Sequence, residues 1–119
     1  MLAVGGHVLG EEMARRSVRL ATGLAGGVGG THQEMCGALS GGVMVIGGVC
    51  GRDSASEDDQ AAYEFAARYR ERFLAELGTT RCAELYEQMH APGGPGSCSP
   101  VVERAARILL DLLAAHEPM

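Results

Sequence analysis

One stretch of the chain, from Leu20 to Gly51, carries almost no charge, and its only formally charged side chain is Glu34. A segment so poor in charge must be buried, either inside a protein or in lipid. It begins with a glycine-rich part, residues 23–30, and continues as an apolar run from Met35 to Gly51. We therefore expect the rest of the fold to be arranged around this apolar run.

The apolar run is at the lower edge of the roughly 17–25 residues that a membrane-spanning helix needs. Glycines interrupt it repeatedly, and Gly37, Gly41 and Gly48 fall on one face of a helix, as close contact with another helix requires. We expect this face to pack against protein rather than lipid. A membrane-associated subunit is the less favoured alternative.

Size and composition limit the fold to one domain, because 119 residues can form a single core but not two ordinary ones. Aromatic residues make up only 4% of the chain and Trp is absent, so the core must be built from small and aliphatic side chains. The net charge of -5 argues against a nucleic-acid surface, which relies on clustered positive charge. We therefore expect one helical domain over residues 1–119 and no nucleic-acid partner.

Hydrophobic periodicity predicts amphipathic helices on both sides of the apolar run. Before it, a helix of about three turns begins with the acidic residues 11–12, which suit the positive end of a helix dipole. After it, Ser56-Glu57-Asp58-Asp59 is a helix N-terminal signature, and Gly78 ends the helix that follows. A short helix from about Arg81 to Met89 comes next, and Ser99-Pro100 opens the last helix.

The apolar run itself is predicted to lie in a helix that begins near Thr31. Thr31-His32-Gln33-Glu34 fits a capping box, in which the Thr and Glu side chains bond to each other's backbone N–H groups. Such a start places Cys36 in the second turn. No stretch shows the sustained alternation of apolar and polar residues that is typical of strands. The predicted fold class is all-α, a small helical bundle around a buried, glycine-rich central helix.

The four cysteines, Cys36, Cys50, Cys82 and Cys98, include no CxxC pair, so their spacing alone is a weak signal for a metal site. If the apolar run is one unbroken helix, Cys36 and Cys50 are about 21 Å apart, at 1.5 Å per residue. These two cannot share a metal ion or a disulfide. No secretory signal peptide is evident, so we expect a cytoplasmic location, where free, metal-bound or redox-active thiols are commoner than structural disulfides.

Cys36, Cys82 and Cys98 differ from Cys50 because each is predicted at or near the start of a helix. The partial positive charge there favours thiolate over thiol, so three such ends brought together would form a site for sulfur chemistry. His32, one turn before Cys36, and His90, between Cys82 and Cys98, could complete it as bases or metal ligands. The alternative is that the cysteines are small core residues and the histidines lie on the surface.

The order of motifs resembles the four-cysteine family known as C_GCAxxG_C_C. Cys36-Gly37-Ala38-Leu39-Ser40-Gly41 is a CGAxxG motif, although its order is Cys-Gly-Ala where the family name spells Gly-Cys-Ala. Arg19 to Gly23 precedes it, and Cys82 and Cys98 follow in the family's order. The resemblance covers nearly the whole chain. It implies a helical protein that uses its cysteines for redox chemistry or for an iron-sulfur or other metal centre.

By this resemblance Cys36, Cys82 and Cys98 match family cysteines, whereas Cys50 does not. The family's first cysteine lies on a helix ahead of the part that matches residues 1–9. We therefore expect either that the true start lies upstream or that this protein has lost one ligand. Three thiolates with His32, His90, water or a partner's residue would then have to complete a metal centre.

The sequence thus predicts a redox-active protein in which Cys36, Cys82 and Cys98 act as redox thiols or, with His32 and His90, as metal ligands. Its cofactor would be an iron-sulfur cluster or another metal ion, and its partner a redox protein. Whether it turns over a substrate stays open. The alternative is a non-enzymatic helical module, in which the glycine face around Gly41 and Gly48 mediates oligomerisation or partner binding and the cysteines are inert.

Overall fold

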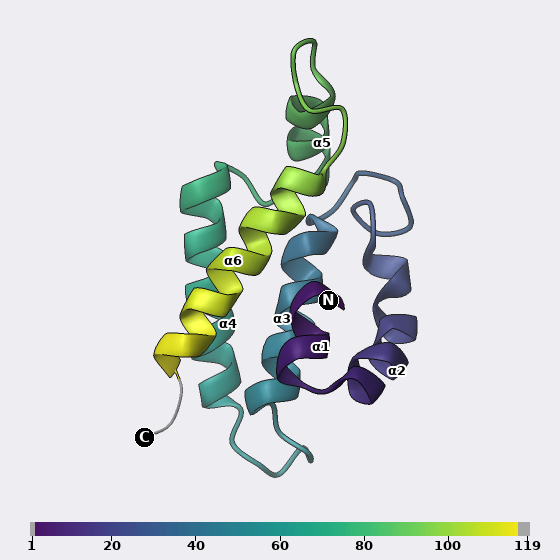
Figure 1. The fold of residues 1–119 in the computed structure, drawn as a ribbon. Helices are drawn as coiled ribbons and strands as arrows, with labels where there is room; N and C mark the ends of the chain where they lie inside the picture. Colours follow the sequence, from purple (N-terminus) through teal and green to yellow (C-terminus); the bar gives the residue numbers. More distant parts are fainter. Residues whose placement is uncertain (1, 117–119) are drawn as a thin grey trace.

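The computed structural model describes residues 2–116, and helices account for most of this range (Figure 1). They are α1 (Leu2–Val8), α2 (Glu11–Ala21), the short 3-10 helix η1 (Thr22–Leu24), α3 (Gly37–Cys50), α4 (Gln60–Leu77), α5 (Cys82–His90) and α6 (Ser99–His116). Within residues 2–116 the one β-type contact is an isolated antiparallel bridge between Met35 and Arg81. The predicted all-α fold is confirmed.

The core lies between α3, α4 and α6, which pack side by side, while α1 crosses against α3 and α6 (Figure 1). On α4 the buried residues recur every four positions, so that they form one apolar stripe along the helix. These residues are Phe65, Tyr69, Phe73 and Leu77. They pack in one cluster with Ile46 of α3 and Leu109 of α6.

Helix α3 is central, but only one side of it is enclosed. Leu39, Val45 and Ile46 are buried, whereas Val43 and Val49 are exposed. Helix α2 packs mainly against α1 (Figure 1). None of the helices within residues 2–116 combines the length and apolar character needed to cross a membrane.

The start of α3 differs from the sequence prediction. The Thr31 hydroxyl donates to the carbonyl oxygens of Gly27 and Val28, at 3.0 and 2.8 Å, so it caps no helix. Helix α3 begins only at Gly37, with Cys36 as its N-cap. The predicted capping box is therefore wrong, because the preceding glycine-rich loop takes up the Thr31 side chain.

The other predicted helix ends agree more closely with the structure. Gly78 ends α4 in the left-handed conformation, with φ of 85°. Helix α4 begins at Gln60, slightly after the predicted Ser56 signature, and the Asp58 carboxylate accepts a hydrogen bond from the Gln60 N–H. Helices α5 and α6 begin at Cys82 and Ser99, within one residue of the predicted positions.

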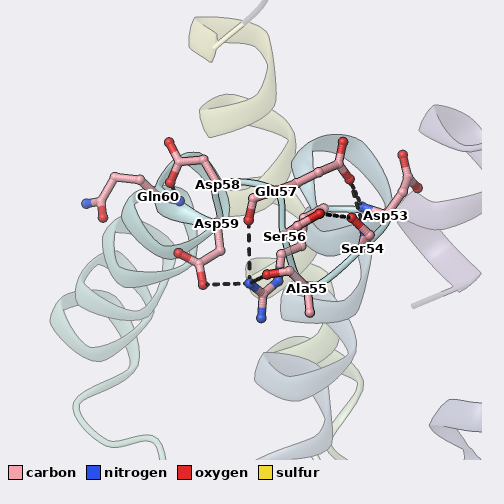
Figure 2. Close-up of polar contacts among 9 residues, drawn as sticks. Asp53, Ser54, Ala55, Ser56, Glu57, Asp58, Asp59 and Gln60 are labelled. Carbon is pink, nitrogen blue, oxygen red and sulfur yellow. Dashed lines mark hydrogen bonds and ion pairs between the residues drawn. The ribbon is translucent and has the colours of Figure 1, made fainter.

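The connection from α3 to α4, residues 51–59, is held by contacts within itself (Figure 2). The Arg52 guanidinium donates to the Ala55 carbonyl at 3.1 Å and pairs with the Asp59 carboxylate at 3.5 Å. The Glu57 carboxylate accepts from the backbone N–H groups of Asp53 and Ser54. This connection is therefore built almost entirely from local interactions.

Candidate functional site

Three helices begin at the same end of the molecule, and a cysteine lies at each of these beginnings (Figure 1). Cys36 is the N-cap of α3, and its carbonyl accepts from the first turn of that helix. Cys82 is the first residue of α5. Cys98 directly precedes α6, and its carbonyl likewise accepts from two N–H groups of the first turn.

Two backbone hydrogen bonds hold the start of α3 against the start of α5. The N–H of Cys36 donates to the Thr80 carbonyl at 2.8 Å, and the N–H of Cys82 donates to the Glu34 carbonyl at 3.0 Å. They flank the antiparallel bridge between Met35 and Arg81. In this register Cys36 and Cys82 are diagonal neighbours on one face of the pair. A contact between segments far apart in the chain therefore brings the two thiols together.

A cavity of about 690 Å³ opens beside these helix starts. All five candidate residues line it, namely Cys36, Cys82, Cys98, His32 and His90. The rest of the wall comes from α2, η1, the loop after η1, α3, α5 and α6. Cys36 and Cys82 are buried, at 9% and 7% exposure, while Cys98 is half-buried. The folded chain thus brings three of its four thiols to a single cavity.

The glycine-rich loop lines one side of the cavity through Ala25 and Gly26, and Gly27 lies directly beside Cys82. Residues 26–30 are all left-handed, with φ between 62° and 70°. Four of the five are glycines, which adopt this conformation without the steric strain that a side chain brings. A Cβ at Gly27 would lie 2.6 Å from the Cβ of Cys82 and 3.2 Å from its Sγ. Only a glycine fits there, so this loop packs tightly against the Cys82 side chain.

An aromatic stack lines the same cavity. The Tyr86 ring lies 4.2 Å from the ring of His32 and 3.9 Å from that of His90, measured between centroids. One nitrogen of His90, Nδ1, is 2.9 Å from the Tyr86 carbonyl. Sequence reasoning missed Tyr86. Its spacing was the available signal, because Cys82, Tyr86 and His90 follow each other at four-residue intervals and so share one face of α5.

The electrostatics of the thiols differ from the sequence prediction that helix N-termini favour thiolates. Burial raises the pKa of Cys82, and the negative charges of Cys36 and Cys98 raise it further. Burial also raises the pKa of Cys98, again with a contribution from Cys36. The prediction is therefore wrong in direction for these two, because burial and mutual repulsion disfavour their ionised forms.

Tyr69 places a hydroxyl close to the start of α3. It donates to the Ala38 carbonyl at 3.3 Å, and its side chain fills the space beside Gly42, where a Cβ would meet the ring. Burial raises the pKa of Tyr69, and the charge of Cys36 adds to this effect. The neutral phenol therefore acts as a fixed hydrogen-bond donor beneath the cysteine end of the helix.

A metal centre needs several ligand side chains that converge on one point. Within the described part of the chain, no three His, Cys, Asp or Glu side chains converge closely enough to hold one metal ion. The predicted metal centre of Cys36, Cys82, Cys98, His32 and His90 is not formed by the side chains as they stand. The arrangement fits thiols that share a cavity better than ligands around one ion.

Cys50 lies away from this group. It is the last residue of α3, and its Sγ donates to the Ile46 carbonyl at 3.4 Å, one turn earlier in the same helix. Burial alone raises the pKa of Cys50. It does not line the cavity.

A protein-family model matches most of the chain. The model of the family described as "Putative redox-active protein (C_GCAxxG_C_C)" covers residues 3–112 of this chain. No curated protein and no solved structure matches the chain.

Proposed function

The chain belongs to the family described as "Putative redox-active protein (C_GCAxxG_C_C)", and from this premise we propose that it works by thiol–disulfide chemistry in which Cys36 pairs reversibly with Cys82 or Cys98. The observation that carries this proposal is the single cavity lined by these three thiols, which come from three separate helix starts. Family membership supports redox chemistry in general. The cavity supports these particular sulfur atoms.

The three thiols can be assigned different roles, one as the nucleophile and the others as candidates for the resolving thiol. A thiolate is the attacking form in disulfide chemistry, so the cysteine that reacts first must lose its proton. The charge of Cys36 raises the pKa of both Cys82 and Cys98, so Cys36 lies close enough to act on each of them. We assign Cys36 as the nucleophile and the other two as candidates for the resolving thiol.

The redox step balances as a two-electron exchange. The S–H bonds of two cysteines break and one S–S bond forms, while two electrons and two protons pass to an acceptor. His32 and His90 line the same cavity, so an imidazole nitrogen of either can accept a proton from a thiol. This gives the two histidines a role as proton carriers.

A disulfide between Cys36 and Cys82 requires a small backbone shift. Diagonal neighbours across an antiparallel pair lie about 7–8 Å apart, whereas the Cα atoms of a disulfide are usually about 4.4–6.8 Å apart. Gly37 follows Cys36 directly, and the exposed glycine-rich residues 93–96 precede Cys98, so both segments contain backbone that can adjust. We therefore retain both Cys82 and Cys98 as candidates for the resolving residue.

The proposal is tested by oxidising the fully reduced protein anaerobically with one equivalent of diamide, which accepts two electrons and two protons. After blocking of the remaining thiols, peptide mass spectrometry identifies the bonded pair. We expect one intramolecular disulfide that contains Cys36, and a free Cys50. The Cys50→Ser variant is the matched control and should give the same product. Thiols that react only after denaturation would instead establish the inert helical module.

A further inference from the structure

The proposed thiol chemistry needs an acceptor for its electrons, and the lining of the cavity limits what that acceptor can be. Among the described residues that line the cavity, none is Asp, Glu, Lys or Arg. Much of the wall is apolar instead, with Val18 of α2, Leu24 of η1, Ala38 of α3 and Val101 of α6. An ionic ligand would lose its hydration there without finding a counter-charge. The cavity therefore suits a neutral molecule.

The size of the cavity and its aromatic wall restrict the ligand further. A volume of about 690 Å³ lies within the about 300–1,000 Å³ that is typical of small-molecule sites. His32, Tyr86 and His90 supply aromatic rings, which pack well against a flat ring. The imidazole nitrogens also supply polar groups that can bond to carbonyl oxygens.

We propose that the cavity binds a neutral quinone and that this quinone accepts the electrons of the thiols. This inference rests on the proposed thiol redox function. Two cysteine S–H bonds break and one S–S bond forms. The quinone gains two electrons and two protons, so its two carbonyl oxygens become hydroxyl groups. The thiols are oxidised, the quinone is reduced to a hydroquinone, and no further reactant is required.

The test uses tetramethyl-1,4-benzoquinone, because its four methyl groups block simple addition of a thiol to a free ring position. Reduced protein is mixed anaerobically with this quinone, and hydroquinone formation is followed by ultraviolet absorbance. We expect one hydroquinone for each disulfide that contains Cys36, with a rate that saturates as the quinone concentration rises. A trimethyl analogue with a carboxylate side chain should react at least about tenfold more slowly, because its charge must be desolvated.

Two matched variants show whether the quinone reacts inside the cavity or elsewhere on the surface. Val18→Asp places a charge in the cavity wall, whereas Val43→Asp places one on the exposed side of α3, outside the cavity. We expect Val18→Asp to slow the quinone reaction by about tenfold and to leave the rate with hydrogen peroxide unchanged. Val43→Asp should change neither rate.

The outcomes separate this inference from the proposed function. If peroxide forms the disulfide with Cys36 but the neutral quinone reacts no faster than its charged analogue, the quinone inference is overturned and the thiol function stands. If neither oxidant forms that disulfide, both fail. A saturable quinone reaction that Val18→Asp alone weakens establishes the inference.

Discussion

The two ends of α3 each carry a cysteine, about 21 Å apart at 1.5 Å per residue, yet their surroundings have little in common. At the first end, Cys36 is tied by its N–H to Thr80, more than forty positions later in the chain, and it shares a cavity with two other thiols. At the second end, the Cys50 thiol donates to the Ile46 carbonyl, one turn earlier in the same helix. The connection that follows it is closed by local contacts of Arg52 and Glu57 (Figure 2).

This difference teaches that long-range contacts, rather than the residue type or the helix, define the site. Burial raises the pKa of Cys50, but no neighbouring charge contributes. At the other end of α3 the thiols act on one another's ionisation, which requires that they be close together in space. The comparison can be tested by changing one end at a time.

The largest effect is expected from removing the thiol at the cavity end of α3. Cys36→Ser should abolish the expected intramolecular disulfide, since Cys36 is the proposed nucleophile whether its partner is Cys82 or Cys98. Cys50→Ser should leave the rate and the product unchanged. The measurement is disulfide formation with diamide, read by mass spectrometry after thiol blocking, with circular dichroism as the check on folding. If Cys50→Ser had the larger effect, the site would have been placed at the wrong end of the helix.

A stability effect of roughly 1–3 kcal/mol is expected where the glycine-rich loop presses on Cys82. Gly27→Ala would put a Cβ 2.6 Å from the Cys82 side chain. Gly29→Ala is the matched control, because Gly29 has almost the same φ but nothing within 4 Å. Both variants share the penalty of a left-handed alanine, so the difference in their free energies of unfolding measures the crowding of the new Cβ against Cys82 and the His32 backbone. Equal values from urea unfolding would show that the loop does not support Cys82.

A smaller effect, a change of a few-fold, is expected on the alkylation rates of the remaining thiols. Removing the negative charge of Cys36 should lower the pKa of Cys82 and Cys98, because that charge helps to raise both. A lower pKa gives more thiolate at a fixed pH near 8. In Cys36→Ser, iodoacetamide should therefore alkylate Cys82 and Cys98 faster than in the unchanged protein. Cys50 is the internal control, and its rate should stay constant, whereas a uniform acceleration of all three would indicate loosened structure.

The elements with local signals were predictable from the sequence. Helix α4 could be predicted from local signals alone. Its apolar residues recur every four positions up to Leu77, and Gly78 marks its end. The beginnings of α5 and α6, and thus the positions of Cys82 and Cys98, follow from similar signals. These predicted helix starts set Cys36, Cys82 and Cys98 apart from Cys50, and the family resemblance pointed to the same three residues.

The features that depend on distant contacts were not predictable. Thr31 and Glu34 have the local pattern of a helix cap, but the left-handed run at residues 26–30 draws the Thr31 hydroxyl back into the loop. The bridge between Met35 and Arg81 has no signature in either segment, because it consists of backbone hydrogen bonds. The raised pKa values of Cys82 and Cys98 follow from burial and from the charge of neighbouring cysteines, and both depend on how distant parts of the chain pack together.

The smallest effect is expected on stability, from the Tyr69 hydroxyl. This hydroxyl, on α4, donates a hydrogen bond to the first turns of α3. Tyr69→Phe removes the hydrogen bond to the Ala38 carbonyl and should lower the free energy of unfolding by about 1 kcal/mol. Tyr63→Phe is the control on the same helix, where the ring is 65% exposed, and it should have no measurable effect. Because the Tyr69 phenol is neutral at ordinary pH, its loss should leave the alkylation rates of Cys82 and Cys98 unchanged. A stability loss without a rate change would show that this hydroxyl anchors the helix, whereas a change in both would add it to the groups that set thiol reactivity.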